Sequence, residues 1–99
     1  METREDILEF LRSKREFFRQ QFYVIKIGLF GSFARNEQTP TSDIDLIIEM
    51  DADVQDVYRL KVKMRDFIST HCKRSVDLAR EKYLRPYARE QILKEAIFV

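Results

Sequence analysis

The segment from Asp43 to Met50 narrows the possible folds most, because its aliphatic and acidic side chains alternate. Alternation with a period of two is typical of a β-strand, in which successive side chains point to opposite faces. One face carries Ile44, Leu46 and Ile48, and the other carries Asp43, Asp45 and Glu49 together with Ile47. The aliphatic face must be covered, so the segment predicts a sheet with helices packed against it.

The rest of the chain divides into further helix and strand patterns. Thr3 and Asp6 resemble a capping box, Asp51 or Asp53 is expected to cap a long helix, and Pro86 suits the first turn of a last helix. We therefore predict helices over 4–21, 54–71 and 86–96, and strands over 24–30, 43–50 and 75–79. The order α-β-β-α-β-α indicates an α/β (α+β) fold, a small mixed β-sheet with helices packed against it, formed by a single domain over residues 1–99.

Composition excludes several classes of protein. Apolar residues make up 44% and charged residues 35%, as in a soluble globular domain. The net charge of +1 gives no reason to expect direct nucleic-acid binding or an anionic membrane surface, and no apolar run approaches a membrane span. The N-terminus lacks a signal-peptide core, and the single cysteine, Cys72, cannot form an internal disulfide, which fits a cytoplasmic setting. His71 and Cys72 lack the spacing of metal ligands, so we expect structural roles for both.

Asp43 and Asp45 would project from one strand face with Cα atoms roughly 6.5–7 Å apart. Two ionised carboxylates held this close repel each other, and a Mg²⁺ ion, which prefers oxygen ligands, would compensate them. Val76-Asp77-Leu78 repeats the pattern of an acid between two aliphatic residues, so Asp77 would join the other two if the strands are neighbours. Three such acids could hold two metals about 3.5–4 Å apart, the spacing used in phosphoryl transfer. The plainer alternative is that these are ordinary acids on an exposed strand face or turn.

Gly31 and Ser32 follow the first strand directly. Gly31 removes a side chain where the backbone turns or a ligand approaches, and Ser32 would begin a short helical turn over 32–35 whose free amides suit a phosphate. Arg35, one turn later, is a candidate second phosphate contact. The alternatives are an ordinary strand-ending turn and a solvated arginine. We expect Gly28 to be a tight packing position in the strand, and Phe30 and Phe33 to lie in the core.

These residues together resemble a known family. Gly31-Ser32, ten intervening residues and Asp43-x-Asp45 match the G-S-x(10)-D-x-D signature of the nucleotidyltransferase superfamily that includes DNA polymerase β. The string GSFARNEQTPTSDIDL, the later Val76-Asp77-Leu78 and the closing ILKEAI look like the minimal nucleotidyltransferase (MNT) domains of bacteria and archaea. Asn36 replaces a family glycine, and Asn tolerates the left-handed backbone needed there. Phe33 stands where the family is often basic.

The resemblance implies a polymerase β-like nucleotidyltransferase fold and an activity. Asp43, Asp45 and Asp77 would be catalytic and bind Mg²⁺, with two ions, while Gly31, Ser32 and Arg35 would bind nucleotide phosphates. The reaction would transfer AMP from ATP to a hydroxyl. Minimal nucleotidyltransferases occur with HEPN-domain proteins as toxin-antitoxin pairs, so the resemblance makes this chain the antitoxin of such a pair, acting on its toxin partner.

Two alternatives stay open. The chain could neutralise a partner by contact alone, as a non-catalytic binding module, or it could modify a small molecule. The sequence leaves the acceptor hydroxyl and the oligomeric state open.

Overall fold

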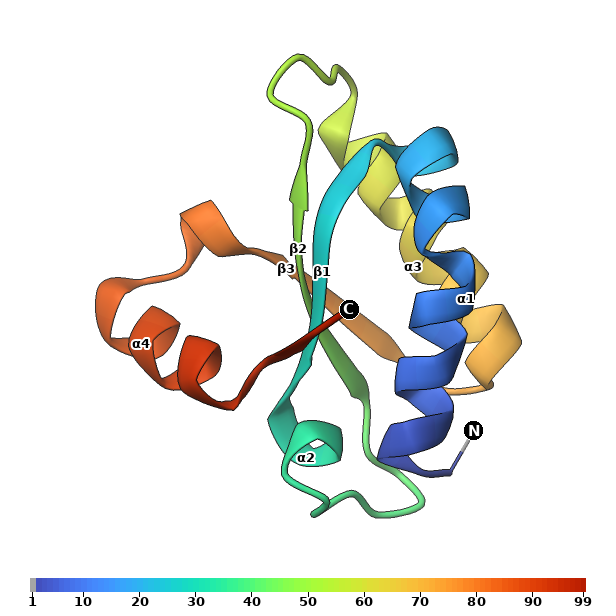
Figure 1. The fold of residues 1–99 in the computed structure, drawn as a ribbon, viewed down its shortest axis with the longest axis vertical. Coiled ribbons are helices and arrows are strands. Elements are labelled where there is room, and N and C mark those ends of the chain that lie inside the picture. The colour runs from blue at the N-terminus through green and yellow to red at the C-terminus, as the bar shows by residue number, and fades with distance from the viewer. Residues whose placement is uncertain (1) are drawn as a thin grey trace.

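Four strands form one mixed sheet in the order β3-β2-β1-β4, in a computed structural model that describes residues 2–99 (Figure 1). β1 runs antiparallel to both β2 and β4, and β2 runs parallel to β3. The mixed α/β fold predicted from the sequence is confirmed; Met1, with which the predicted domain begins, lies outside the described residues. The elements are α1 (Arg4–Phe22), β1 (Val24–Phe30), α2 (Gly31–Ala34), β2 (Ile44–Met50), α3 (Val57–Cys72), β3 (Val76–Arg80), the 3₁₀ turn η1 (Glu81–Tyr83), α4 (Pro86–Glu95) and β4 (Ile97–Phe98).

Helices α1 and α3 cover one face of the sheet, and α4 lies on the other side (Figure 1). The main core lies under α1 and α3, where the aliphatic face of β2 is fully buried. Thr3 caps α1 as predicted, since its hydroxyl accepts a hydrogen bond from the Asp6 amide at 3.1 Å. Within residues 2–99, no helix is both long and apolar enough to cross a membrane.

An aromatic cluster joins α1 to α3. The ring centroids of Phe67 and His71 lie 4.4 Å apart, and those of Phe10 and His71 lie 5.6 Å apart. Cys72 is buried, and burial raises the pKa of its thiol. His71 and Cys72 therefore both contribute to packing, which fits the structural roles predicted for them.

The middle of the second face of the sheet is covered by the C-terminal segment, residues 81–99. Ile47 is 1% exposed, yet it lies outside the main core. Gly28 makes room there for the ring of Phe98: a Cβ on Gly28 would lie 2.7 Å from Phe98 Cδ1 and 3.2 Å from Ile47 Cγ2. Gly28 is therefore the tight packing position that the sequence predicts.

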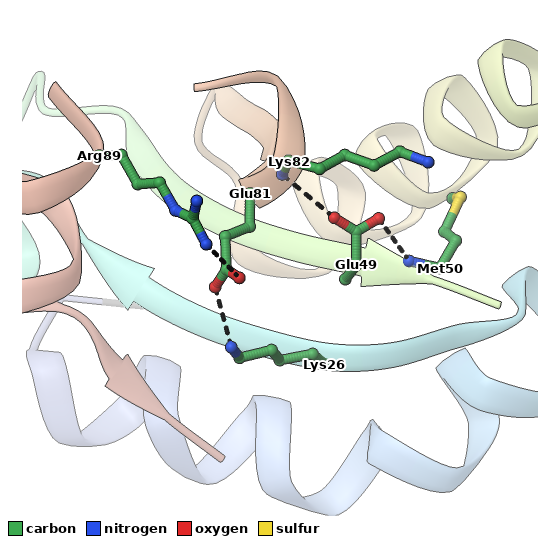
Figure 2. Close-up of polar contacts among 6 residues, drawn as sticks. All are labelled: Lys26, Glu49, Met50, Glu81, Lys82 and Arg89. Carbon is green, nitrogen blue, oxygen red and sulfur yellow. Dashed lines mark hydrogen bonds and ion pairs between the residues drawn. The ribbon is translucent and has the colours of Figure 1, made fainter. Parts of the chain in front are cut away.

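Ion pairs fasten the C-terminal segment to the sheet (Figure 2). Glu81 accepts from Lys26 of β1 at 2.8 Å and pairs with Arg89 of α4 at 3.5 Å. Glu49 of β2 accepts from the backbone amide of Lys82 and from the Arg80 guanidinium. Burial alone would raise the pKa of Glu49, but these hydrogen bonds outweigh it and lower the pKa. α4 itself contributes no buried residue, so polar contacts carry much of its attachment.

Several sequence predictions are wrong in detail. α3 begins at Val57 rather than 54, and neither Asp51 nor Asp53 caps it, because Asp51 Oδ1 accepts the Asp53 amide and closes a turn before the helix. The last helix ends at Glu95, and Ile97 instead pairs with Leu29 as part of β4. Phe33 is buried as predicted, but Phe30 is only half-buried, because it lies on the sheet face that carries the acids. The short elements η1 and β4 are absent from the predicted order.

The close packing of Gly28 against Phe98 can be tested. We expect Gly28→Ala to lower the free energy of unfolding by about 1 kcal/mol, because the added Cβ must displace a partly exposed ring. In a Phe98→Ala background the same change should cost measurably less. Urea unfolding of the four proteins in the cycle measures this coupling, and equal costs in both backgrounds would contradict the packing described.

Candidate active site

The parallel pairing of β2 with β3 brings two of the predicted site residues side by side. Asp45 and Asp77 are direct register partners across the two strands. Paired residues of neighbouring strands project from the same sheet face, so the adjacency predicted for Asp77 is confirmed. Asp43 lies one residue before β2, and its negative charge acts on Asp45. The three acids thus gather at one end of the sheet face opposite α1 and α3.

The carboxylates of the three aspartates differ from the glutamates on the same face in having no partner. Among residues 2–99, Asp43, Asp45 and Asp77 accept no hydrogen bond and form no ion pair, whereas Glu49 and Glu81 each have two or more. In the described part of the chain, no three His, Cys, Asp or Glu side chains stand at the spacing of a closed metal site.

The electrostatic consequence falls on Asp45. Burial, together with the negative charges of Asp77 and Asp43, raises the pKa of Asp45 to about 6, although the positive charge of Arg35 opposes the shift. An aspartate ordinarily titrates near 3.9, so the folded protein holds Asp45 in a setting that disfavours its charge. A cation placed among the three acids would reverse that effect.

Because Gly31 has no side chain, its backbone lies close to the Asp45 carboxylate. Its φ is +76°, in the left-handed region that favours glycine, and a Cβ at this position would collide with the Asp45 carboxylate. Gly31 also opens α2, so the first amides of that turn have no intrahelical partner. The Ser32 hydroxyl makes no hydrogen bond within residues 2–99. Asn36 has φ 58°, the left-handed conformation that the sequence predicts for it.

Arg35 follows the end of α2, and its guanidinium already pairs with two glutamates. Its guanidinium contacts Glu37 and Glu95, each at 2.8 Å, and hydrogen bonds to these carboxylates raise its pKa above the usual range. The contact with Glu95 links the turn to the last residue of α4. Arg35 is therefore near Asp45 but would have to leave a carboxylate in order to bind a phosphate.

Sequence reasoning missed one residue that shapes the site. Arg74, two residues beyond the end of α3, reaches across to the loop between α2 and β2. It donates to the carbonyls of Thr39 and Ser42 at 3.2 and 2.9 Å, and its guanidinium lies 4.8 Å from the centre of the Phe33 ring. This contact holds the loop that leads into Asp43. The ten-residue spacing between Ser32 and Asp43 was the only signal in the sequence that this loop is fixed.

Comparison with known proteins gives consistent results. A family model described as "Nucleotidyltransferase domain" matches residues 11–99. The Methanocaldococcus jannaschii protein named "Putative protein adenylyltransferase MJ1379" is 32% identical over 100 residues, which cover 100% of both chains. A solved structure described as "Structure of putative minimal nucleotidyltransferase" has a TM-score of 0.73 and 30% identity, and the match covers 91% of this chain and 93% of that one. The expected nucleotidyltransferase fold is therefore confirmed.

A second solved structure, "Crystal structure of the toxin-antitoxin with AMP-PNP", has a TM-score of 0.66. It is 18% identical and the match covers 96% of this chain and 70% of that one, a likeness of fold alone.

The raised pKa of Asp45 makes a prediction about stability and pH. The folded state binds the Asp45 proton more tightly than the unfolded state does, so ionisation costs stability as pH rises from about 4 to about 6. At pH 7.5 we expect the free energy of unfolding of Asp45→Asn, measured with urea, to exceed that of the wild type by about 2 kcal/mol. This difference should vanish below about pH 4. Asp51→Asn, an exposed acid just beyond the other end of β2, is the control. An Asp45→Asn advantage that persists unchanged at low pH would refute this account.

Proposed function

This chain belongs to the nucleotidyltransferase domain family and is a transferase, and on that premise we propose that it transfers AMP from ATP to a hydroxyl of a partner protein. The observation that carries the proposal is the set of three partnerless carboxylates beside the Gly31 turn. Asp43, Asp45 and Asp77 have no stabilising partner in the described chain, although the same sheet face pairs its glutamates. An arrangement that costs stability is expected where a ligand supplies the missing charge.

The donor set fits a hard divalent cation. All three side chains offer carboxylate oxygens, which Mg²⁺ prefers, and none offers sulfur or imidazole nitrogen. Asp43, Asp45 and Asp77 would hold Mg²⁺, with two ions shared among them. When bound, Mg²⁺ would supply positive charge that orients the α-phosphate and offsets the charge on the departing pyrophosphate.

The remaining residues position the substrates. Gly31 and Ser32 would receive the β- and γ-phosphates at the start of α2, where amides and a hydroxyl are available. Arg35 would contact the phosphates by exchanging one of its carboxylate partners. In the reaction, a bond forms between the acceptor oxygen and the α-phosphorus, and the bond from that phosphorus to the bridging oxygen of pyrophosphate breaks. Asp77 is more exposed than Asp45, its register partner, and would take the hydroxyl proton.

A protein acceptor is supported by the names of the relatives and by the shared fold. One Methanocaldococcus jannaschii relative is named "Putative protein adenylyltransferase MJ1379", and the toxin-antitoxin structure shares the fold. We propose that the partner is a HEPN-domain toxin and that this chain is its antitoxin in the cytoplasm. The net charge of +1 favours a protein acceptor over direct binding of nucleic acid.

A labelling experiment tests the proposed transfer. We expect the chain, incubated with Mg²⁺ and α-labelled ATP, to label the product of its neighbouring gene, and Asp43→Ala to bring labelling to background. Asp77→Asn should lower kcat at least about 100-fold, because it removes both the proton acceptor and one carboxylate of the metal site. Asp51→Ala is a matched control outside the site.

Two results would overturn the proposal. A stable complex with the neighbouring gene product that survives Asp43→Ala without any labelling would establish a non-catalytic binding module. Transfer of label to a small molecule, with no labelled protein, would establish the small-molecule transferase.

A direct readout of the metal is thermal unfolding: Mg²⁺ should raise the melting temperature of the wild type more than that of Asp45→Asn.

A further inference from the structure

β3 forms an open edge of the sheet next to the acid site. In residues 2–99 its only strand neighbour is β2. The Ile44 amide donates to the Ser75 carbonyl at 2.9 Å, so the backbone of Ser75 faces β2. Backbone groups alternate in direction along a strand, which turns the N–H and C=O groups of Val76 and Leu78 outward. An unpaired edge of this kind is a template for a strand from another chain.

A shallow pocket beside this edge combines Asp77 with side chains of α3. Its lining residues are Tyr58, Lys61, Val62, Arg65, Asp77 and Leu78. The α3 members recur at helical spacing, so they form one stripe along the helix. The pocket is therefore bounded by a cationic helix stripe on one side and by the free backbone of β3 and its acid on the other.

The aromatic and cationic side chains of this pocket are available to a partner. Tyr58 is 82% exposed, more than any other exposed large hydrophobic side chain of the described chain. Within residues 2–99 Lys61 forms no ion pair, and the ion pair of Arg65 is with its neighbour Asp66 at 3.6 Å. Exposed aromatic side chains and arginine are enriched in protein interfaces, where cations complement acidic partners.

We propose that the β3 edge and the stripe Tyr58, Lys61 and Arg65 form the docking surface for the acceptor, an extended acidic segment of a partner protein that carries the hydroxyl. The segment would add a strand to β3, as extended peptides do on other exposed sheet edges. Its acidic side chains would face Lys61 and Arg65 and be repelled by Asp43 and Asp45, which leaves the hydroxyl to approach Asp77. The inference rests on the proposed function, which supplies both the acceptor hydroxyl and the role of Asp77.

The experiment uses a fluorescent random Glu–Tyr copolymer, an extended acidic chain that bears hydroxyls. We expect it to bind the wild type, and the double variant Lys61→Glu with Arg65→Glu to weaken binding at least about tenfold. The matched control is Arg59→Glu with Lys63→Glu, the same charge change on a different side of α3, where both residues line another pocket. The control should bind the copolymer as the wild type does, and ATP affinity should be equal in all three proteins.

Hydrogen exchange tests the added strand. The amides of Val76 and Leu78 should exchange more slowly when the copolymer is bound. Failure of the copolymer to bind, equal weakening in both double variants, or unchanged exchange at β3 would each overturn the docking surface. Tighter binding of poly(U) with the same dependence on Lys61 and Arg65 would assign the surface to nucleic acid instead. Binding with the expected dependence but without transfer of label from ATP would support the surface and count against the proposed function.

Discussion

The parallel pairing of β2 with β3 is the contact on which the site depends. Register places Asp45 opposite Asp77, and a slip by one residue would turn one of the two acids into the core. The buried aliphatic residues on the other face of both strands prevent such a slip, since Ile44, Leu46 and Leu78 must remain under the helices. Packing on one face therefore fixes the positions of charges on the other, although those charges repel each other.

Both glycines of the chain serve this acid-bearing face. Gly28 admits the Phe98 ring, which lets the C-terminal segment cover the middle of the face. Gly31 leaves room for the Asp45 carboxylate at one end, with a backbone conformation that suits glycine. At the other end, Glu49 and Glu81 are tied by cations and amides (Figure 2). One face is thus divided into an end whose acids are paired and an end whose acids are unpaired, where we propose that the ligand binds.

The spacing of apolar and acidic residues along the sequence predicts those helices and strands that form from contacts between nearby residues. Alternation placed β2 and its acidic face, helical spacing placed α1 almost to the residue, and an acid between two aliphatics marked Asp77. What the sequence did not predict depends on contacts distant along the chain. β4 is a strand only because Ile97 and Phe98 meet β1, and Arg74 is a loop clamp only because the fold brings it to Ser42. Glu95 likewise became a partner of Arg35 through the packing of α4 near α2.

Among residues 2–99 no arginine or lysine forms an ion pair with the three aspartates, although Arg35 and Arg74 lie on neighbouring segments. Arg35 turns to Glu37 and Glu95, and Arg74 turns to backbone carbonyls and the Phe33 ring. Had either guanidinium paired with Asp45, it would have lowered the pKa of that carboxyl and stabilised the empty protein. The same pairing would compete with any cation or phosphate entering the site. Because Arg35 and Arg74 bind other acceptors, the three carboxylates remain unpaired, and this lowers the stability of the folded protein. Binding of a ligand can restore that stability.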